Sequence, residues 1–244
     1  MRLPYGRRFY SDHADGSIRS ASVVVPMVLE TVPARSVVDV GCGVGTWGKQ
    51  FIDNGVAEFT GIDGPHVDPE LLKIPAQWFI AHDLETPLRL DRTFDLAVSL
   101  EVAEHLSPQR AASFVSDLCA LAPAVLFSAA IPGQWGTNHR NERWPEYWRA
   151  LFEALRFEPY DCLRRRIWWD ERIEPWYRQN LLLYARTDDR EKYAHLDCRG
   201  PLSLVHPRTL EKYRKGHHSL VVPSIRAGFR SLWRAARRLP VAWR

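Results

Sequence analysis

The chain has 244 residues, 45% hydrophobic and 25% charged, which predicts one globular domain with its own core and excludes a disordered polymer or a disulfide-stapled miniprotein. Its four cysteines form no CxxC pair and no apolar run is long enough to cross a membrane, so we expect a cytoplasmic protein without a zinc ribbon. Residues 206–244 hold ten basic side chains and one acidic side chain, whereas residues 1–205 hold 23 basic and 28 acidic, which argues against a nucleic-acid-binding body.

Short apolar runs alternate with helical patterns along the first 190 residues, which predicts an α/β sheet flanked by helices. The predicted helices are 20–31, 45–54, 108–121 with Ser107 as its cap, and 145–155 with proline in its first turn. The predicted strands are 36–40, 59–62, 78–81, 94–100 and 124–130, with 157–162 and 180–185 completing the sheet. We expect residues 132–144 to be irregular and residues 191–244 to form a separate basic helical extension.

A glycine-rich turn directly follows the first predicted strand. Gly41, Gly43 and Gly45 predict positive φ angles or a close approach of the backbone to a ligand. The next helix would direct its free N–H groups at this turn, and Asp63 ends the next strand, where it can accept from ribose hydroxyls. Thr46 replaces the third glycine of the dinucleotide motif, so the turn favours a nucleotide-like ligand other than NAD.

The segment from Val38 to Gly45 resembles the first motif of class I S-adenosylmethionine-dependent methyltransferases. Later segments agree in order: residues 61–64 resemble the ribose-binding turn of that family, 82–84 its adenine-contacting turn, and 94–105 its fourth strand and following helix. The resemblance implies a Rossmann-like seven-stranded sheet and S-adenosylmethionine as cofactor. The cofactor-binding residues that it implies are Asp39, Gly41, Cys42, Gly43, Gly45, Asp63, Gly64, Asp83, Leu84 and Glu101.

A polar and aromatic segment, residues 131–148, follows the fifth predicted strand, at the sheet edge where ligands bind in such folds. Methyl transfer to an alcohol requires alignment of the acceptor with the methyl carbon and removal of the hydroxyl proton. His139 is our first choice of base, although a hydrogen bond that only stabilises the loop is the alternative role. We expect aromatic rings here to stack on a sugar and amides to bind its hydroxyls, with ordinary packing as the alternative. The predicted substrate-binding residues are Trp135, Asn138, Asn141, Trp144 and Tyr147.

A second arrangement uses the E-x-x-E-H spacing of Glu101, Glu104 and His105, which a helix would place on one face. With His139 these residues would form an oxygen and nitrogen site for Mg²⁺ or Mn²⁺ that acidifies a bound diol. The spacing is similar to the metal site of small-RNA 2′-O-methyltransferases and of some ubiquinone-pathway O-methyltransferases, but many metal-free class I enzymes also carry it. Glu104 and His105 are therefore predicted to serve catalysis with or without a metal.

Residues 139–148, together with parts of 161–180, resemble bacterial methyltransferases of polysaccharide pathways, some of which methylate mannosides. This resemblance implies O-methylation of a saccharide hydroxyl, with a small molecule or an oligosaccharide as acceptor. The alternatives are an RNA 2′-O-methyltransferase, a non-catalytic S-adenosylmethionine-binding protein and, last, a dehydrogenase. An acidic body disfavours RNA binding, which requires a positive channel.

The C-terminal extension has an amphipathic pattern. Ile225, Phe229, Leu232 and Trp233 share one helical face, and arginines occupy much of the remaining surface. Such a helix predicts docking on the domain or on a second copy in a homo-oligomer, with peripheral contact to an anionic membrane as the alternative.

Overall fold

The computed structural model describes residues 7–196 and 200–211, with side chains from residue 15 onward. The chain divides into a compact unit, Met1–His206, and a second unit, Pro207–Arg244. Beyond residue 190, Tyr193 and Leu202 are buried in the core of the first unit. The amphipathic pattern at 225–233 lies outside the described residues. Within the described part, no helix is long and apolar enough to cross a membrane.

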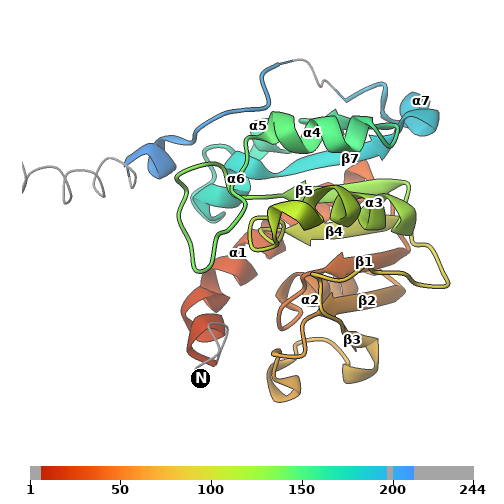
Figure 1. Cartoon of the computed structure of the whole chain (residues 1–244), viewed down its shortest axis with the longest axis vertical. Helices are drawn as coiled ribbons and strands as arrows, with labels where there is room; N and C mark the ends of the chain where they lie inside the picture. Colours follow the sequence, from red (N-terminus) through yellow and green to blue (C-terminus); the bar gives the residue numbers. More distant parts are fainter. Residues whose placement is uncertain (1–6, 197–199, 212–244) are drawn as a thin grey trace, which may run out of the picture. The chain divides into compact units, whose positions relative to one another are not determined.

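The first unit is built on one mixed sheet with the strand order β3-β2-β1-β4-β5-β7-β6 (Figure 1). Six of these seven strands run in the same direction, and β7 alone is reversed, because it pairs antiparallel with both β5 and β6. The chain winds outward in both directions from the neighbours β1 and β4, which opens a crevice at their carboxyl ends. The strands are β1 (Ser36–Val40), β2 (Glu58–Asp63), β3 (Phe79–Ala81), β4 (Leu96–Leu100), β5 (Ala124–Ser128), β6 (Phe157–Tyr160) and β7 (Leu182–Arg186).

Helices cover both faces of the sheet, with α3 and α4 together on one face (Figure 1). On the opposite face, α1 and α2 pack against each other and against the sheet. This layering confirms the α/β fold predicted from the sequence. The helices are α1 (Arg7–Thr31), α2 (Thr46–Asp53), α3 (Ala111–Leu121), α4 (Pro145–Glu153), α5 (Arg164–Ile167), α6 (Pro175–Asn180) and α7 (Arg190–Tyr193), with 3-10 turns η1 (Pro69–Leu71), η2 (Ala76–Trp78), η3 (Pro108–Arg110) and η4 (Thr187–Asp189).

The central strands are apolar at successive positions because each strand contributes to two cores. In β1, Val37 belongs to the core formed with α1 and α2, whereas Val38 belongs to the core formed with α3 and α4. Leu96 and Ala97 of β4 divide in the same way. Parallel strands buried on both faces have this continuous hydrophobic pattern. Each fully buried aliphatic side chain contributes about 1.5–3 kcal/mol, so the two cores fix the strand ends that carry the site.

Three predicted local structures differ from the observed ones. Ser107 does not cap a helix: its hydroxyl donates to Glu85 at 2.8 Å, and the turn η3 precedes α3. The predicted helical face for the E-x-x-E-H motif is also wrong, because residues 101–106 form irregular turns. The helix that the sequence predicts to start at Ser20 starts at Arg7. The earlier start was not predicted because residues 7–19 are mostly polar and show no continuous apolar stripe.

Candidate active site

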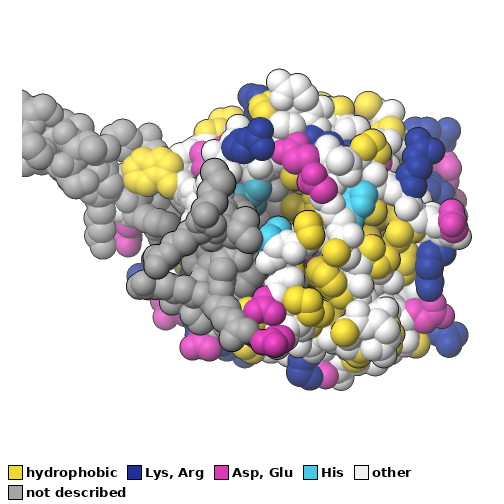
Figure 2. Space-filling model, turned by 60° about the horizontal axis from the view of Figure 1, so that its bottom comes forward, with side chains coloured by type: hydrophobic (Ala, Val, Ile, Leu, Met, Phe, Trp, Pro, Cys, Tyr) yellow, Lys and Arg dark blue, Asp and Glu magenta, His cyan; other side chains and the backbone are white. Residues whose placement is uncertain are grey.

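A cavity of about 480 Å³ lies at the carboxyl ends of β1, β2 and β4, where the strand order reverses. The space-filling view shows a hollow with histidine and hydrophobic side chains beside it (Figure 2). The cavity lies within the size range of small-molecule and cofactor sites. Of the ten residues predicted to bind the cofactor, seven line it: Gly41, Gly43, Asp63, Gly64, Asp83, Leu84 and Glu101.

Backbone geometry forms the wall of this cavity after β1. Gly41 has φ +88°, its N–H donates to the carbonyl oxygen of Ile62 at 2.7 Å, and a Cβ atom there would lie 2.2 Å from the side chain of Val102. Gly43 has φ +54° and its N–H donates to Oδ2 of Asp63 at 2.7 Å. The turn is thus fixed to the end of β2 and offers no room for a side chain at Gly41.

Three of the predicted cofactor residues lie behind the cavity wall rather than in it. Gly45 is the N-cap of α2, with φ +79°, and a Cβ atom there would meet the side chain of Ile74 at 2.8 Å, so this glycine leaves room for Ile74. The buried thiol of Cys42 donates to the carbonyl oxygen of Gly43. Asp39 is 3% exposed. These residues support the turn, and its inner lining is backbone.

Two neighbouring aspartates, Asp39 and Asp63, determine the charge of this wall. Burial, and then the charge of Asp63, raise the pKa of Asp39 to about 8. Burial also raises the pKa of Asp63, but backbone N–H groups of Gly43 and Gly64 donate to its two carboxylate oxygens and oppose the rise. The backbone donors therefore favour the ionised form of Asp63 over that of Asp39, and it is Asp63 that lines the cavity, where a diol could donate to it.

Glu101 occupies a strained position directly after β4. Its φ angle is +56°, which costs a non-glycine residue about 1–3 kcal/mol. Its carboxylate accepts from Nε2 of Gln134 at 2.7 Å and from Nδ2 of Asn180 at 3.1 Å. Burial raises the pKa of Glu101 and these hydrogen bonds oppose the rise. The amides therefore hold a buried carboxylate at the cavity wall.

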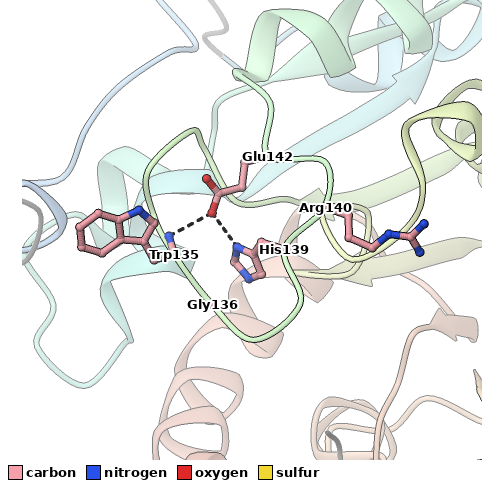
Figure 3. A pocket seen from close by; sticks show the side chains of 5 residues that line it. All are labelled: Trp135, Gly136, His139, Arg140 and Glu142. Carbon is pink, nitrogen blue, oxygen red and sulfur yellow. Dashed lines mark hydrogen bonds and ion pairs between the residues drawn. The ribbon is translucent and has the colours of Figure 1, made fainter.

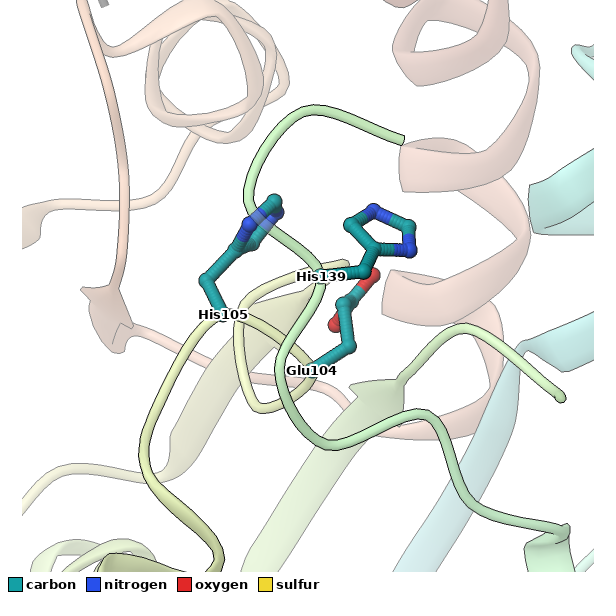
Figure 4. Close-up of side chains that lie close together, drawn as sticks. All are labelled: Glu104, His105 and His139. Carbon is teal, nitrogen blue, oxygen red and sulfur yellow. The ribbon is translucent and has the colours of Figure 1, made fainter. Parts of the chain in front are cut away.

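Three titratable side chains meet beside the cavity: ligand atoms of Glu104, His105 and His139 lie within 4.8 Å of one another (Figure 4). Glu104 is fully buried, and neither of its carboxylate oxygens has a hydrogen-bond partner in the described part of the chain. Burial, and then the neighbouring Glu101, raise the pKa of Glu104 well above its usual range. Burial, and then His139, lower the pKa of His105 to about 4. Glu101, the fourth predicted metal ligand, lies outside this group of three.

The loop of residues 132–144 passes over the Glu104 turn and encloses a second cavity of about 490 Å³ (Figure 3). Backbone N–H groups of Arg140 and Asn141 donate to the carbonyl oxygen of Glu104 at 2.8 and 2.9 Å, which joins the loop to the turn. The second cavity is lined by Trp135, Gly136, His139, Arg140 and Glu142. Because Arg140 lines both cavities, the two are neighbours.

The predicted substrate-binding residues divide into two groups. Trp135 lines the second cavity and Asn138 lines the first, so both can contact a bound molecule. Trp144 is 43% exposed at the start of α4 but lines neither cavity. Asn141 is buried, and Tyr147 of α4 is partly buried against the core. Neither of these two side chains lines either cavity.

Sequence reasoning missed three polar residues of the site. Gln134 and Asn180 bind Glu101, and the carboxylate of Glu142 lies 2.7 Å from Nδ1 of His139. The H-x-x-E spacing of His139 and Glu142 was a usable signal. No local pattern connects Gln134 with Asn180, because they come from separate segments of the chain.

Two neighbouring cavities of similar volume thus meet at the site: one has the glycine turn and the Asp63 carboxylate in its wall, and the other has the His139 imidazole in its wall. Bringing a donor and an acceptor together at fixed orientation is the main requirement of group transfer. The two neighbouring cavities therefore have a geometry that can support transfer of a group from one bound molecule to another.

Comparison with known proteins gives a family and a fold. The family model described as "Methyltransferase domain" matches residues 19–165. No curated protein sequence matches the chain. Among solved structures, the sugar N-methyltransferase KedS8 from Streptoalloteichus is 17% identical, with a TM-score of 0.57 over 73% of this chain and 91% of that one.

Two further solved structures share the fold at similar distance. Magnesium protoporphyrin IX methyltransferase from Synechocystis, with bound S-adenosylhomocysteine, is 18% identical, with a TM-score of 0.53 over 74% of this chain and 92% of that one. CalS10 from Micromonospora echinaspora, an amino pentose methyltransferase with bound S-adenosylmethionine, is 15% identical, with a TM-score of 0.53 over 77% and 99%. At these identities the likeness shows the fold alone.

Proposed function

The chain belongs to the class I S-adenosylmethionine-dependent methyltransferases, and from this premise we propose that it methylates a hydroxyl group of a saccharide. The first cavity is the site for the methyl donor, and the second cavity is the site for the acceptor. The observation that carries the proposal is the position of His139, which lies in the wall of the acceptor cavity and contacts the turn that borders the donor cavity.

The residues of the first cavity fit S-adenosylmethionine, which supplies an electrophilic methyl group on a sulfonium. The Gly41–Gly43 backbone lines this cavity without a side chain at either glycine, so the methionine part can approach it closely. Asp63 keeps lone pairs for the ribose hydroxyls, and Asp83 with Leu84 borders the adenine end. The carboxylate of Glu101 adds negative charge to a cavity that receives a cationic donor.

His139 is the proposed base. As the acceptor oxygen forms its bond to the methyl carbon, the carbon–sulfur bond breaks with its electron pair on sulfur, and Nε2 of His139 takes the hydroxyl proton. Nε2 has no hydrogen bond to a described residue, which leaves its lone pair available. The loop excludes bulk water from the ring, since the side chain of His139 is 12% exposed.

A saccharide is favoured as acceptor because the second cavity has a partly exposed aromatic wall. Trp135 is 44% exposed and lines the cavity, so its ring face can cover the apolar face of a sugar ring. Two solved structures with this fold, KedS8 and CalS10, act on sugars according to their descriptions. KedS8 is described as an N-methyltransferase and CalS10 as an amino pentose methyltransferase. For this chain we propose oxygen as the acceptor atom, because His139 is placed to remove a hydroxyl proton.

A divalent metal is a second candidate for activating the acceptor, and one observation favours it. The fully buried Glu104 carboxylate has two oxygens without hydrogen-bond partners among the described residues, which is costly unless a cation or a proton binds there. Glu104, His105 and His139 would hold Mg²⁺ or Mn²⁺, and such an ion would acidify a bound hydroxyl. This donor set, with two imidazoles, suits Mn²⁺ better than Mg²⁺.

One assay tests the proposal. The protein is incubated with S-adenosylmethionine and a panel of mono- and disaccharides, with Mn²⁺, with Mg²⁺ or with excess EDTA, and the methyl group is located by mass spectrometry. We expect a product 14 mass units heavier, methylated on oxygen. Methylation on nitrogen only, or S-adenosylmethionine binding without transfer to any saccharide, would overturn the assignment. Full activity in EDTA would exclude the metal and leave His139 as the base.

A further inference from the structure

Glu142 is the central hydrogen-bond acceptor of the loop that encloses the acceptor cavity. Its Oε2 accepts the backbone N–H of Gly133 at 2.7 Å, and its Oε1 accepts the backbone N–H of Trp135 at 3.0 Å. The same Oε1 lies 2.7 Å from Nδ1 of His139 (Figure 3). The carboxylate thus connects the backbone at Gly133 and Trp135 with the imidazole of His139. The Glu142 side chain is only 18% exposed.

This contact determines which nitrogen of His139 carries the proton. An ionised carboxylate only accepts hydrogen bonds, so a ring nitrogen at 2.7 Å from it must be the donor. Nδ1 is therefore protonated, and Nε2 of the neutral ring is the basic atom. Without Glu142 the ring would be free to adopt the other tautomer, whose protonated Nε2 could neither accept a proton nor bind a cation.

A second contact limits the orientation of the ring. Nε2 of His139 lies so near Gly136 that a Cβ atom at that glycine would be 2.1 Å away. Gly136 has no positive φ angle in the structure, so its conformation does not require glycine. Glycine is required at this position because the imidazole of His139 approaches so closely. The ring is held between the carboxylate of Glu142 on the Nδ1 side and the backbone of Gly136 on the Nε2 side.

We propose that Glu142 is the positioning residue of the active site: it fixes the Nδ1–H tautomer and the orientation of His139. The inference rests on the proposed function, because the positioning matters for catalysis only if His139 acts on the acceptor. It holds whether His139 takes the proton directly or binds a divalent metal, since both require the lone pair of Nε2. Glu142 itself does not touch the reacting atoms.

Glu85 provides the comparison that singles out Glu142. It is also a loop carboxylate near the cavities, but it accepts from Ser107 and from Arg140 rather than from an imidazole. Within the described part of the chain, the only side-chain hydrogen bond of His139 is the one to Glu142. Loss of Glu142 therefore affects the ring, whereas loss of a carboxylate elsewhere does not.

The tautomer can be measured without any acceptor. A long-range ¹H–¹⁵N correlation spectrum of uniformly labelled protein, with His139→Gln used to assign the ring, distinguishes protonated from unprotonated imidazole nitrogens. We expect Nδ1–H in the wild type and a mixture or reversal of tautomers in Glu142→Gln. Gln offers one acceptor oxygen to the three donors that the carboxylate serves. A wild-type ring protonated at Nε2 would overturn the proposal at once.

Kinetics with the acceptor found in the saccharide panel supply the second readout. Glu142→Gln should lower kcat about 10- to 100-fold, the usual effect of removing a group that orients a catalytic imidazole, with the acceptor KM and the S-adenosylmethionine affinity changed less than about threefold. Gly136→Ala should lower kcat by displacing the ring from the other side, while it keeps the two backbone hydrogen bonds that Glu142 accepts from Gly133 and Trp135. Glu153→Gln, which removes an exposed carboxylate paired with Arg149, is the matched control and should match the wild type.

The outcomes separate the two proposals. Unchanged kcat and tautomer in Glu142→Gln would refute the positioning role. Loss of S-adenosylmethionine binding in that variant would also refute it, because it would show that Glu142 only supports the fold of the loop. If the wild-type tautomer and its change in Glu142→Gln are as expected but no saccharide is methylated, the positioning geometry stands and the proposed function fails.

Discussion

The two cavities of the site are built by different means. The donor cavity is walled by backbone: the glycine turn after β1 hydrogen-bonds to the end of β2, and Asp63 accepts from two backbone N–H groups. The loop at the acceptor cavity depends on one side chain: the Glu142 carboxylate accepts from two backbone N–H groups and contacts His139, in addition to the backbone hydrogen bonds that join the loop to the carbonyl oxygen of Glu104. Backbone walls tolerate few side-chain changes nearby, whereas a side-chain network can be altered without loss of the fold.

The two cavities also differ in how their buried charge is satisfied. Asp63 accepts two backbone hydrogen bonds, but Glu104 has no partner for either carboxylate oxygen within the described ranges. A buried carboxylate with hydrogen-bond partners costs the fold little stability. A buried carboxylate without partners costs about 1–3 kcal/mol of stability and is tolerated where it serves function. The comparison predicts that variants on the donor side change cofactor affinity and variants on the acceptor side change turnover.

The largest expected effect lies on the acceptor side. His139→Ala should lower kcat by at least about 100-fold through loss of proton removal, with S-adenosylmethionine affinity nearly unchanged. The measurement is kcat with the identified saccharide, combined with calorimetric titration of S-adenosylmethionine. Wild-type turnover in this variant would remove His139 from the mechanism. A parallel loss of cofactor affinity would contradict the separation between the cavities.

The next largest effect lies on the donor side. Gly41→Ala places a Cβ atom 2.2 Å from Val102 at φ +88°, so the turn must shift, and S-adenosylmethionine affinity should fall about 50-fold. Turnover at saturating cofactor should stay within about threefold of the wild type. Gly55→Ala is the matched control: φ is +94° there, but a Cβ atom would meet nothing within 4 Å. It introduces the backbone strain without the clash, and cofactor affinity should be unchanged.

The same division explains what the sequence could predict. The donor side depends on contiguous motifs, so the turn at Gly41 and the acid at Asp63 were predictable, and the alternation of short strands and helices was sufficient for the fold. The acceptor side depends on hydrogen bonds between segments distant in sequence, such as Gln134 with Asn180, which no spacing reveals. Glu104 and His105 were predicted to meet through a helix, but an irregular turn brings them together.

A stability measurement tests the electrostatics beneath the donor cavity. Burial raises the pKa of Asp39 to about 8, whereas an unfolded aspartate titrates near 3.9. Between these values the folded chain binds the extra proton, so wild-type stability should fall as pH rises from 5 to 8, by up to roughly 4 kcal/mol at about 1.4 kcal/mol per pH unit. Urea unfolding of cofactor-free Asp39→Asn should show a flatter profile, because its amide does not titrate.

The control for this measurement is Asp53→Asn, which removes an exposed carboxylate paired with Lys49. This variant should retain the wild-type slope, since an exposed ion pair contributes little to stability. A wild-type stability that rises between pH 5 and 8, or an equal slope in Asp39→Asn, would show that Asp39 is ionised in the folded chain.

The smallest expected effect tests whether the acceptor cavity binds a sugar ring through its aromatic wall. Trp135→Ala removes the exposed indole but keeps the backbone N–H that donates to Glu142, so the loop and His139 should stay in place. The saccharide KM should rise about fivefold, equivalent to roughly 1 kcal/mol of lost stacking, with kcat little changed. Trp169→Ala, which removes an indole that is 74% exposed and lines neither cavity, should leave both constants unchanged. A fall in kcat without a rise in KM would instead place the Trp135 ring in the alignment of the reacting atoms, because an interaction lost only in the transition state lowers turnover and spares binding.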